Sequence, residues 1–180
     1  MAADIKTKST RIVYENRWMR VREDAIERAD GSPGIYGVVE KADFAIIVPI
    51  DNGVIHLVEQ YRYPVKGRYW ELPQGSWEQS PDADPLELAR AELREETGLT
   101  AETMIHVGHL FECYGYSTQG YNIYLAKGLR LGDMDREHTE QDMVSGAFPI
   151  DDVLKMVTDG VIKDATTVAA LGLLRLKGML

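Results

Sequence analysis

The chain has 180 residues, of which 44% are hydrophobic and 27% charged, and this composition is typical of one globular domain with a full core. The formal net charge of −9 argues against a nucleic-acid polymer as partner, because such binding depends on a basic surface. The single cysteine excludes an internal disulfide and fits a reducing cytoplasm. The longest apolar run, at 44–50, is far too short to span a membrane, and residues 1–17 show no secretory signal.

Strand patterns dominate the first 42 residues. The stretches TRIVYEN (10–16) and MRVREDAIER (19–28) predict two strands, and IYGVVEK predicts a third after the turn ADGSPG. Exposed edge strands are usually covered in folded proteins. We therefore expect residues 1–42 to form a unit that pairs two subunits into a homodimer, and residues 43–180 to form the catalytic domain.

A hairpin is predicted next. The runs FAIIVPI and VIHLVEQYRY flank Asp51-Asn52-Gly53, and an Asn-Gly pair between β-rich runs favours a type I′ turn, in which both central residues have positive φ. The stretch YWELPQGSW (69–77) predicts a short strand that leads into a glycine loop. Trp70 and Tyr61 could stack on a base or pack in the core, and we expect the core for both.

A helix over 85–97 is clearly delimited. Asp84 is the expected N-cap, Pro85 is at the first helical position, and Gly98 is the expected left-handed residue after the end. The residues predicted to face the core are Leu86, Ala89 and Leu93.

The remaining chain predicts strands at 103–113, 121–127 and near 143–148, with the polar loop LGDMDREHTEQ between the last two. Two helices follow, IDDVLKMVTDG and DATTVAALGLLRLKG, and Asp164 is the expected N-cap of the second. This order of elements predicts an α+β domain with α/β/α layers.

Three carboxylates, Glu92, Glu95 and Glu96, share one side of the 85–97 helix. Like charges at this spacing cost about 0.2–0.5 kcal/mol per pair. Arg90 and Arg94 are expected on another stripe, where they can pair with Glu87 and not with the three carboxylates. A solvated acidic face would explain the pattern, but the lack of a neighbouring cation favours a metal site.

Gly75, a loop and AELREETGL together resemble the Nudix box, G-x5-E-x7-R-E-U-x-E-E-x-G-U, in which U is aliphatic. The matching residues of the helix are Glu92, Leu93, Glu95, Glu96, Gly98 and Leu99. The stretches VEQYRYP, YWELPQG and GVIKDATTVAALGLL are similar to the ADP-ribose pyrophosphatase branch, whose extra N-terminal strands exchange between subunits. The resemblance implies a Nudix fold with a mixed central sheet and extra antiparallel strands.

Two box positions differ from the pattern. The loop after Gly75 is two residues longer, so the first box glutamate falls on Ala83, and the box arginine falls on Ala91. Glu78 and Arg90 are the nearby residues that could compensate, and the sequence leaves this open.

The resemblance also implies a chemistry. It predicts Mg²⁺-dependent hydrolysis, with Mn²⁺ as a substitute, and metal ligands from Glu92, Glu95, Glu96 and the Gln74 carbonyl. Mg²⁺ takes such hard oxygen ligands, clamps a diphosphate and activates water. The expected substrate-binding residues are Arg62, Glu71 and Gly75, although Arg62 could equally form a salt bridge and Glu71 could be structural.

The general base is expected outside the box, because metal-bound carboxylates are poor bases. Glu137, Glu140 and Asp142 are the candidates in the polar loop, and Glu140 best matches the branch through the stretch EQDM. A solvated acidic loop is the alternative, and Glu95 is the next candidate for the base.

The sequence thus predicts a cytoplasmic pyrophosphatase acting on ADP-ribose or another nucleotide sugar. Two alternatives stay open. One is a pyrophosphohydrolase of dinucleoside polyphosphates or RNA 5′ ends, because PQG also occurs in that branch. The other is a non-catalytic nucleotide-binding domain, favoured by the two altered box positions.

Overall fold

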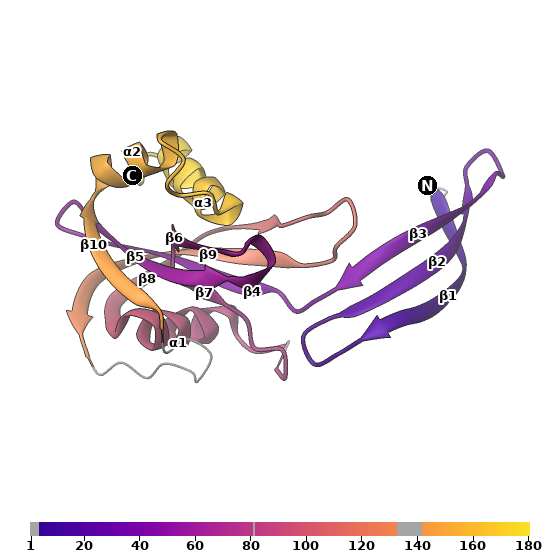
Figure 1. Cartoon of the computed structure of the whole chain (residues 1–180), viewed down its shortest axis with the longest axis horizontal. Helices are drawn as coiled ribbons and strands as arrows, with labels where there is room; N and C mark the ends of the chain where they lie inside the picture. The colour runs from indigo at the N-terminus through magenta and orange to yellow at the C-terminus, as the bar shows by residue number, and fades with distance from the viewer. Residues whose placement is uncertain (1–3, 81, 133–141) are drawn as a thin grey trace.

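The computed structural model describes residues 4–80, 82–132 and 142–180 (Figure 1). Its elements, in chain order, are β1 (Ile5–Glu15), β2 (Arg20–Arg28), β3 (Pro33–Glu40), β4 (Phe44–Asp51), β5 (Val54–Arg62), the 3-10 helix η1 (Tyr63–Val65), β6 (Gly67–Glu71), β7 (Gln74–Gly75), α1 (Pro85–Thr97), β8 (Leu99–Phe111), β9 (Gly120–Leu131), β10 (Val144–Pro149), α2 (Ile150–Thr158) and α3 (Ala165–Leu176). No helix among these described residues is long and apolar enough to cross a membrane.

The strands form two separate sheets. Strands β1, β2 and β3 make an antiparallel three-stranded sheet. The other sheet has the order β10-β5-β4-β9-β8, with β6 added to β5 and β7 added to β4. It is mixed, because β4 and β9 run parallel while the pairs on either side of them are antiparallel.

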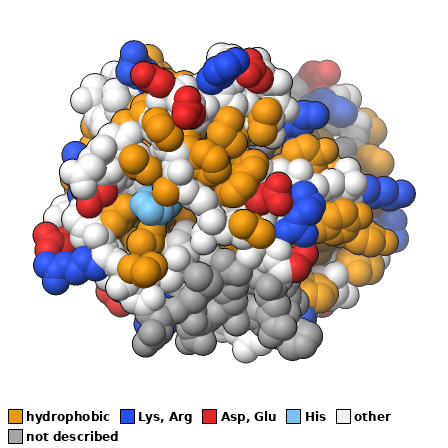
Figure 2. Space-filling model, turned by 60° about the vertical axis from the view of Figure 1, so that its left-hand side comes forward, with side chains coloured by type: hydrophobic (Ala, Val, Ile, Leu, Met, Phe, Trp, Pro, Cys, Tyr) orange, Lys and Arg blue, Asp and Glu red, His pale blue; other side chains and the backbone are white. Residues whose placement is uncertain are grey.

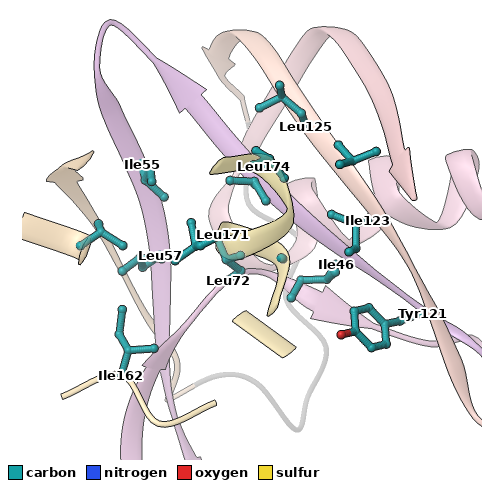
Figure 3. Close-up of a cluster of buried hydrophobic side chains, with 14 of the residues drawn as sticks. Ile46, Ile55, Leu57, Leu72, Tyr121, Ile123, Leu125, Ile162, Leu171 and Leu174 are labelled. Atoms are coloured by element: carbon teal, nitrogen blue, oxygen red, sulfur yellow. The ribbon is translucent and has the colours of Figure 1, made fainter. Parts of the chain in front are cut away.

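Strand β4 lies between two layers of helices and contacts both of them. Ile46 and Val48 belong to a core cluster with residues of α2 and α3, such as Leu171 and Leu174 (Figure 3). Ala45 and Ile47 point the other way, into a second cluster with Leu88, Ala89 and Leu93 of α1. A strand buried on both faces appears as a continuous apolar run. The predicted α/β/α arrangement is confirmed, with α1 on one face and α2 and α3 on the other (Figure 1).

The β4–β5 turn has the predicted chemistry. Asn52 and Gly53 have φ values of 51° and 77°, the left-handed region that a type I′ turn requires at both central positions. The pairs Ile50↔Ile55 and Asp51↔Val54 flank the turn. Helix α1 also has the predicted bounds, but its buried apolar residue near the start is Leu88, with Leu86 only partly buried against the same cluster.

Several strands are longer than their patterns indicate. Strand β1 begins at Ile5 because its polar start still pairs with β2, as far as Ile5↔Arg28. Strands β8 and β9 pair from Leu99↔Leu131 onward. Trp70 packs edge-on against Phe148, with ring centroids 4.9 Å apart, as expected of a core residue.

The expectation for Tyr61 is wrong. Its side chain is 47% exposed, because it lies near the end of β5, opposite Arg68 of β6, where it faces solvent.

The three-stranded sheet stands away from the rest of the molecule and is attached at one end (Figure 1). The Val39 amide donates to the Tyr116 carbonyl at 2.8 Å, and the Thr118 amide donates to the Val39 carbonyl at 3.0 Å. The Gln119 side chain donates to the Ala42 carbonyl at 2.7 Å. The loop between β8 and β9 therefore joins the two sheets.

Candidate active site

Helix α1 is fixed by its caps. The Asp84 carboxylate accepts a hydrogen bond from the Leu86 amide at 2.9 Å, and Pro85 begins the helix. Gly98 ends it in the left-handed conformation, and its amide donates to the Arg94 carbonyl at 2.8 Å. These signals set the rotation of the helix, and with it the direction in which the carboxylates point.

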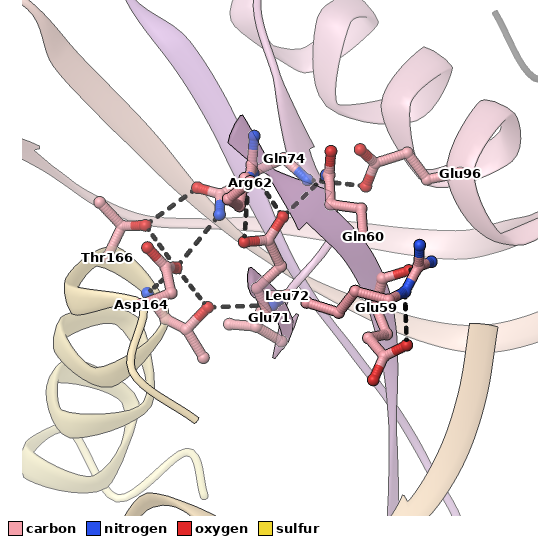
Figure 4. Close-up of polar contacts among 11 residues, drawn as sticks. Glu59, Gln60, Arg62, Glu71, Leu72, Gln74, Glu96, Asp164 and Thr166 are labelled. Carbon is pink, nitrogen blue, oxygen red and sulfur yellow. Dashed lines mark hydrogen bonds and ion pairs between the residues drawn. The ribbon is translucent and has the colours of Figure 1, made fainter. Parts of the chain in front are cut away.

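Glu92 and Glu96 lie one turn apart on α1 and are almost fully buried, with exposed fractions of 5% and 1%. The Gln74 amide of β7 donates to Glu96 Oε2 at 3.0 Å. A Cβ added to Gly75 would lie 2.4 Å from Glu92 Oε2, so any larger residue there would force the Glu92 carboxylate to move. The two carboxylates therefore lie directly against the Gln74–Gly75 backbone, as Figure 4 shows for Glu96 and Gln74.

Glu95 points elsewhere. It is half-buried and lines a separate groove with Glu87, Arg90 and Arg94. Its carboxylate lies 3.9 Å from the Arg94 guanidinium. The expectation that Arg94 would not pair with the three carboxylates is wrong, because the long arginine side chain reaches the adjacent residue around the helix. The roles of Glu95 as third metal ligand and alternative base stay predictions.

Arg62 and Glu71 form an ion pair on neighbouring strands. Arg62 Nε donates to Glu71 Oε2 at 3.1 Å, a terminal guanidinium nitrogen donates to Oε1, and Gln60 donates to the same oxygen at 2.8 Å (Figure 4). Burial raises the pKa of Glu71, which is 2% exposed, and Arg62 opposes that shift. Burial disfavours the charge of Arg62, but Glu71 and other nearby carboxylates hold its pKa above the usual range. The salt-bridge alternative for Arg62 is thus present in the structure.

A cavity of about 510 Å³ opens beside these residues. It brings together four of the predicted residues, Arg62 of β5, Glu71 of β6, and Gln74 and Gly75 of β7, with the start of α3. Its lining includes Lys41, Arg62, Tyr69, Glu71, Gln74, Gly75, Lys163, Asp164 and Thr166. Its lining holds three cationic side chains and three carboxylates, Glu71, Glu112 and Asp164, so any attraction of an anionic ligand comes from Lys41, Lys163 and the side of Arg62 that Glu71 does not engage.

The residues present fit a hard divalent cation. Two buried carboxylates and the adjacent main chain offer oxygen ligands, and the missing Cβ of Gly75 keeps space open at Glu92. Within the described residues, no group of three or more His, Cys, Asp or Glu side chains forms a ready-made metal cluster. Mg²⁺ commonly uses one or two carboxylates and completes its shell with water and substrate oxygens, so Glu92, Glu96 and the Gln74 carbonyl form a suitable set.

Glu137 and Glu140 lie outside the described residues. Asp142 lies inside, and its side chain accepts a hydrogen bond from Arg68 at 2.8 Å. This bond lowers the pKa of Asp142. Asp142 is therefore held in an ion pair with Arg68, which makes it the weaker candidate for a base.

The two candidate compensating residues differ in position. Glu78 accepts a hydrogen bond from the Ser76 hydroxyl at 3.1 Å, close to Gly75. Arg90 donates to the Ala101 carbonyl of β8 at 3.4 Å, on the groove shared with Glu95. Glu78 is thus the one near the cavity wall.

Sequence reasoning missed the polar network at the start of α3. Asp164 was expected only as an N-cap, yet it also accepts from the Gln74 side chain at 3.1 Å. Thr166 and Thr167 extend this network (Figure 4). Two threonines at the second and third positions after an N-cap aspartate were the available signal.

Family comparisons agree with this geometry. The NUDIX domain matches residues 41–171, and the nucleoside diphosphate sugar hydrolase N-terminal domain matches residues 5–39. The chain belongs to the Nudix family of hydrolases, and the resemblance drawn from the box is confirmed.

Individual relatives are similar over nearly the whole chain. An ADP-ribose pyrophosphatase of Mycobacterium tuberculosis is 34% identical over 92% of this chain and 81% of its own length. An ADP-ribose pyrophosphatase of Bacillus subtilis is 27% identical, and a methanol dehydrogenase activator of Bacillus methanolicus 28% identical, each over 96% of this chain and 93% of its own. A solved structure titled as an ADP compounds hydrolase has a TM-score of 0.85 at 20% identity, covering 98% of this chain and 97% of its own, which shows the shared fold.

Proposed function

We propose that this protein is a Mg²⁺-dependent pyrophosphatase that hydrolyses ADP-ribose or a related nucleoside diphosphate sugar to a nucleoside monophosphate and a sugar phosphate. The observation that carries the proposal is the burial of Glu92 and Glu96 against the Gln74–Gly75 backbone, beside a cavity whose lining includes Lys41, Arg62 and Lys163. The relatives named ADP-ribose pyrophosphatase support the substrate class.

Arg62 is suited to hold a phosphate of the substrate. Among the described residues, Glu71 engages its Nε and one terminal nitrogen, so the other terminal nitrogen remains available to a ligand in the cavity. The ion pair fixes the guanidinium plane, and a guanidinium can bind phosphate oxygens through two parallel hydrogen bonds. Lys41 and Lys163 add positive charge around the diphosphate.

Glu92, Glu96 and the Gln74 carbonyl would hold Mg²⁺, which neutralises diphosphate charge and lowers the pKa of bound water when present. In the hydrolysis, a water oxygen forms a bond to phosphorus, the bridging P–O bond breaks, and the departing phosphate keeps the bridging oxygen. We assign the removal of the water proton to Glu140, with Glu95 as the next candidate.

A substrate panel tests this function. Purified protein with Mg²⁺, or with Mn²⁺ in a parallel series, is incubated with ADP-ribose, GDP-mannose, UDP-glucose, NADH, diadenosine polyphosphates and nucleoside triphosphates. Mass spectrometry should detect AMP and ribose 5-phosphate from ADP-ribose, or the equivalent pair from another nucleotide sugar. Preferred cleavage of diadenosine polyphosphates would support the second enzyme alternative, and binding without turnover of any compound would support the non-catalytic one.

We also propose that residues 1–42 form a dimerisation unit and that the active protein is a homodimer. All eleven residues of β1 are exposed, including Ile5, Ile12, Val13 and Tyr14, each at least 47% exposed. Apolar side chains on an exposed edge strand are usually covered by another chain.

The expected setting is the cytoplasm, where nucleotide sugars occur and a lone cysteine stays reduced. No nucleic-acid polymer is expected as partner. On the face drawn in Figure 2, which carries β10 and α2, Lys and Arg are interspersed with Asp and Glu and do not gather into a basic patch. The net charge of −9 points the same way.

A further inference from the structure

The first turn of α3 makes more hydrogen bonds than a helix cap needs. One oxygen of Asp164 accepts from the Thr167 amide at 2.8 Å, which is the capping bond. The same oxygen also accepts from the hydroxyl of Thr167 at 2.6 Å and from the Gln74 side chain at 3.1 Å, and the Thr166 hydroxyl lies 2.7 Å from it. Of these contacts, the one with Gln74 leads away from α3, toward β7.

The Gln74 side chain is held at both ends. Its nitrogen donates to Asp164, and its oxygen lies 2.9 Å from the Thr166 hydroxyl, whose one proton is donated either to this oxygen or to Asp164 (Figure 4). Thr166 is 6% exposed, so this contact is sheltered from water. A primary amide with both its donor and acceptor engaged has one favoured orientation.

The main chain around Gln74 is held as well. The Gln74 amide donates to Glu96 on α1, and the Leu72 amide donates to the fully buried hydroxyl of Thr167 at 2.9 Å. The segment Leu72–Gln74 therefore lies between two helices from opposite faces of the sheet. Helix α3 fixes it from one side and α1 from the other.

We propose that Asp164 and Thr166 are positioning residues that aim the Gln74 carbonyl at the metal site formed with Glu92 and Glu96. This inference rests on the proposed function, in which that carbonyl is a metal ligand. A metal site needs its ligands within about 0.5 Å of the productive geometry. Anchoring the side chain of Gln74 restricts rotation of the peptide whose carbonyl binds the ion.

Substitutions can separate the two roles of the first turn of α3, which are capping the helix and holding the Gln74 side chain. Thr166→Val removes the hydroxyl that reaches Gln74 but leaves the Asp164–Thr167 cap in place. Thr166→Ser keeps the hydroxyl. Gln74→Met removes the other partner of this contact, the side-chain amide of Gln74, and replaces it with a side chain of similar size. Thr158→Val is a matched control, because among the described residues the Thr158 hydroxyl bonds only within α2, to the Lys155 carbonyl at 2.9 Å.

The test measures Mn²⁺ binding to each substrate-free protein by electron paramagnetic resonance of the free ion, beside urea unfolding. Loss of a group that orients a ligand typically weakens metal binding about 10–100-fold. Thr166→Val and Gln74→Met should therefore raise the Kd for Mn²⁺ at least about 10-fold, while Thr166→Ser and Thr158→Val bind as wild type does. In Thr166→Val, kcat should recover at saturating Mn²⁺.

Two outcomes would overturn the inference, and they differ. If Thr166→Val and Gln74→Met unfold more easily but bind Mn²⁺ as tightly as wild type, the network is only structural and the proposed function stands. If wild type itself binds no Mn²⁺, or binds it equally well after Glu92→Gln and Glu96→Gln, the proposed metal site fails and the inference fails with it.

Discussion

The two sheets differ in the burial of their apolar side chains. In β4 of the seven-stranded sheet, six of eight residues are buried between helices on both faces. In β1 of the three-stranded sheet, all eleven residues are exposed. In β2, only Asp24 and Ile26 are buried.

This difference separates two kinds of stability. The seven-stranded unit, with its helices, contains two hydrophobic clusters of its own, so we expect it to fold without help. The three-stranded sheet has no covering layer among the described residues, and sheets without a buried face are marginal in water. We therefore expect substitutions in the first unit to change chemistry and unfolding, and those in the second to change association.

The largest effect is expected from Glu140→Gln, which removes the proposed base from the seven-stranded unit. Loss of general base catalysis typically costs about 10²–10⁴-fold in kcat. KM and the dependence on Mg²⁺ should change little, which steady-state kinetics across Mg²⁺ concentrations can show. Glu137→Gln is the matched control. If the control is the inactive variant, the base is Glu137, and if both are active the base is in the box, with Glu95 first.

Glu96→Gln and Glu92→Gln should each lower kcat by about 10²-fold or more, because each removes a proposed metal ligand. Glu23→Gln in β2 makes the same change where the carboxylate forms an exposed pair with Arg11 at 2.9 Å, and it should leave kcat unchanged. Without metal, the two α1 variants should unfold at a slightly higher temperature than wild type, because a like-charge repulsion is relieved. Full activity of both at saturating Mg²⁺ would reject this helix as the metal site.

Gly75→Ala should destabilise the protein by about 1–3 kcal/mol, the usual cost of forcing extra volume into a packed site. The added Cβ would lie 2.4 Å from Glu92, so activity should fall too. Gly37→Ala in β3 is the control, because a Cβ there meets nothing within 4 Å. Urea unfolding of both variants measures the difference, and equal free energies of unfolding would contradict the close approach.

Ile12→Lys in β1 should raise the Kd of the dimer by about 10-fold or more, as expected for charge placed in an apolar contact. Leu131→Lys at the end of β9 is the control, since it replaces another exposed apolar side chain outside the three-stranded sheet. Light scattering over a dilution series gives the mass of each variant. A wild-type mass near 20.2 kDa at micromolar concentration would show a monomer, and it would reject the proposal that the three-stranded sheet pairs two subunits.

The smallest effect concerns pH. Burial raises the pKa of Glu71 above its ordinary value of 4.5, so the native state holds that proton more tightly than the unfolded chain. The stabilisation is complete below pH 4.5 and is lost as pH rises through the folded-state pKa. As pH rises, the free energy of unfolding of metal-free Glu71→Gln should therefore increase relative to that of metal-free wild type. Urea unfolding at a series of pH values measures this difference.

The pKa of Asp30, in the turn between β2 and β3, is shifted in the opposite direction. A hydrogen bond from Ser32 lowers its pKa below the ordinary 3.8, so its contribution is present above pH 3.8 and is lost as pH falls. Asp30→Asn should therefore be less stable to unfolding than wild type near neutral pH, and this difference in stability should disappear in acid. Parallel curves for Glu71→Gln and Asp30→Asn would show that neither carboxyl is perturbed as described.

Local signals in the sequence were enough to place the elements that the site depends on. The bounds of α1 follow from Asp84, Pro85 and Gly98, which are adjacent to the helix ends they determine. The Asn-Gly turn is equally local. The start of β1 was missed because an exposed edge strand carries no alternation of apolar and polar residues.

The site was only partly predictable for a physical reason. Glu92, Glu96 and Gly75 belong to a continuous motif, so their proximity follows from helix geometry and one short loop. Gln74 and Asp164 are 90 residues apart, and no local pattern indicates that they touch. The contact of Arg94 with Glu95 depends on the conformation of a long side chain, which periodicity does not determine.

The joint between the sheets is also a wall of the cavity. Lys41, Glu112 and Gln119 line the cavity, and Gln119 donates the hydrogen bond to Ala42 at the end of the three-stranded sheet. A rotation of that sheet about residues 40–43 would move these side chains and alter the width of the opening. The shape available to a substrate is thus tied mechanically to the angle at which the N-terminal sheet is held, whatever holds it.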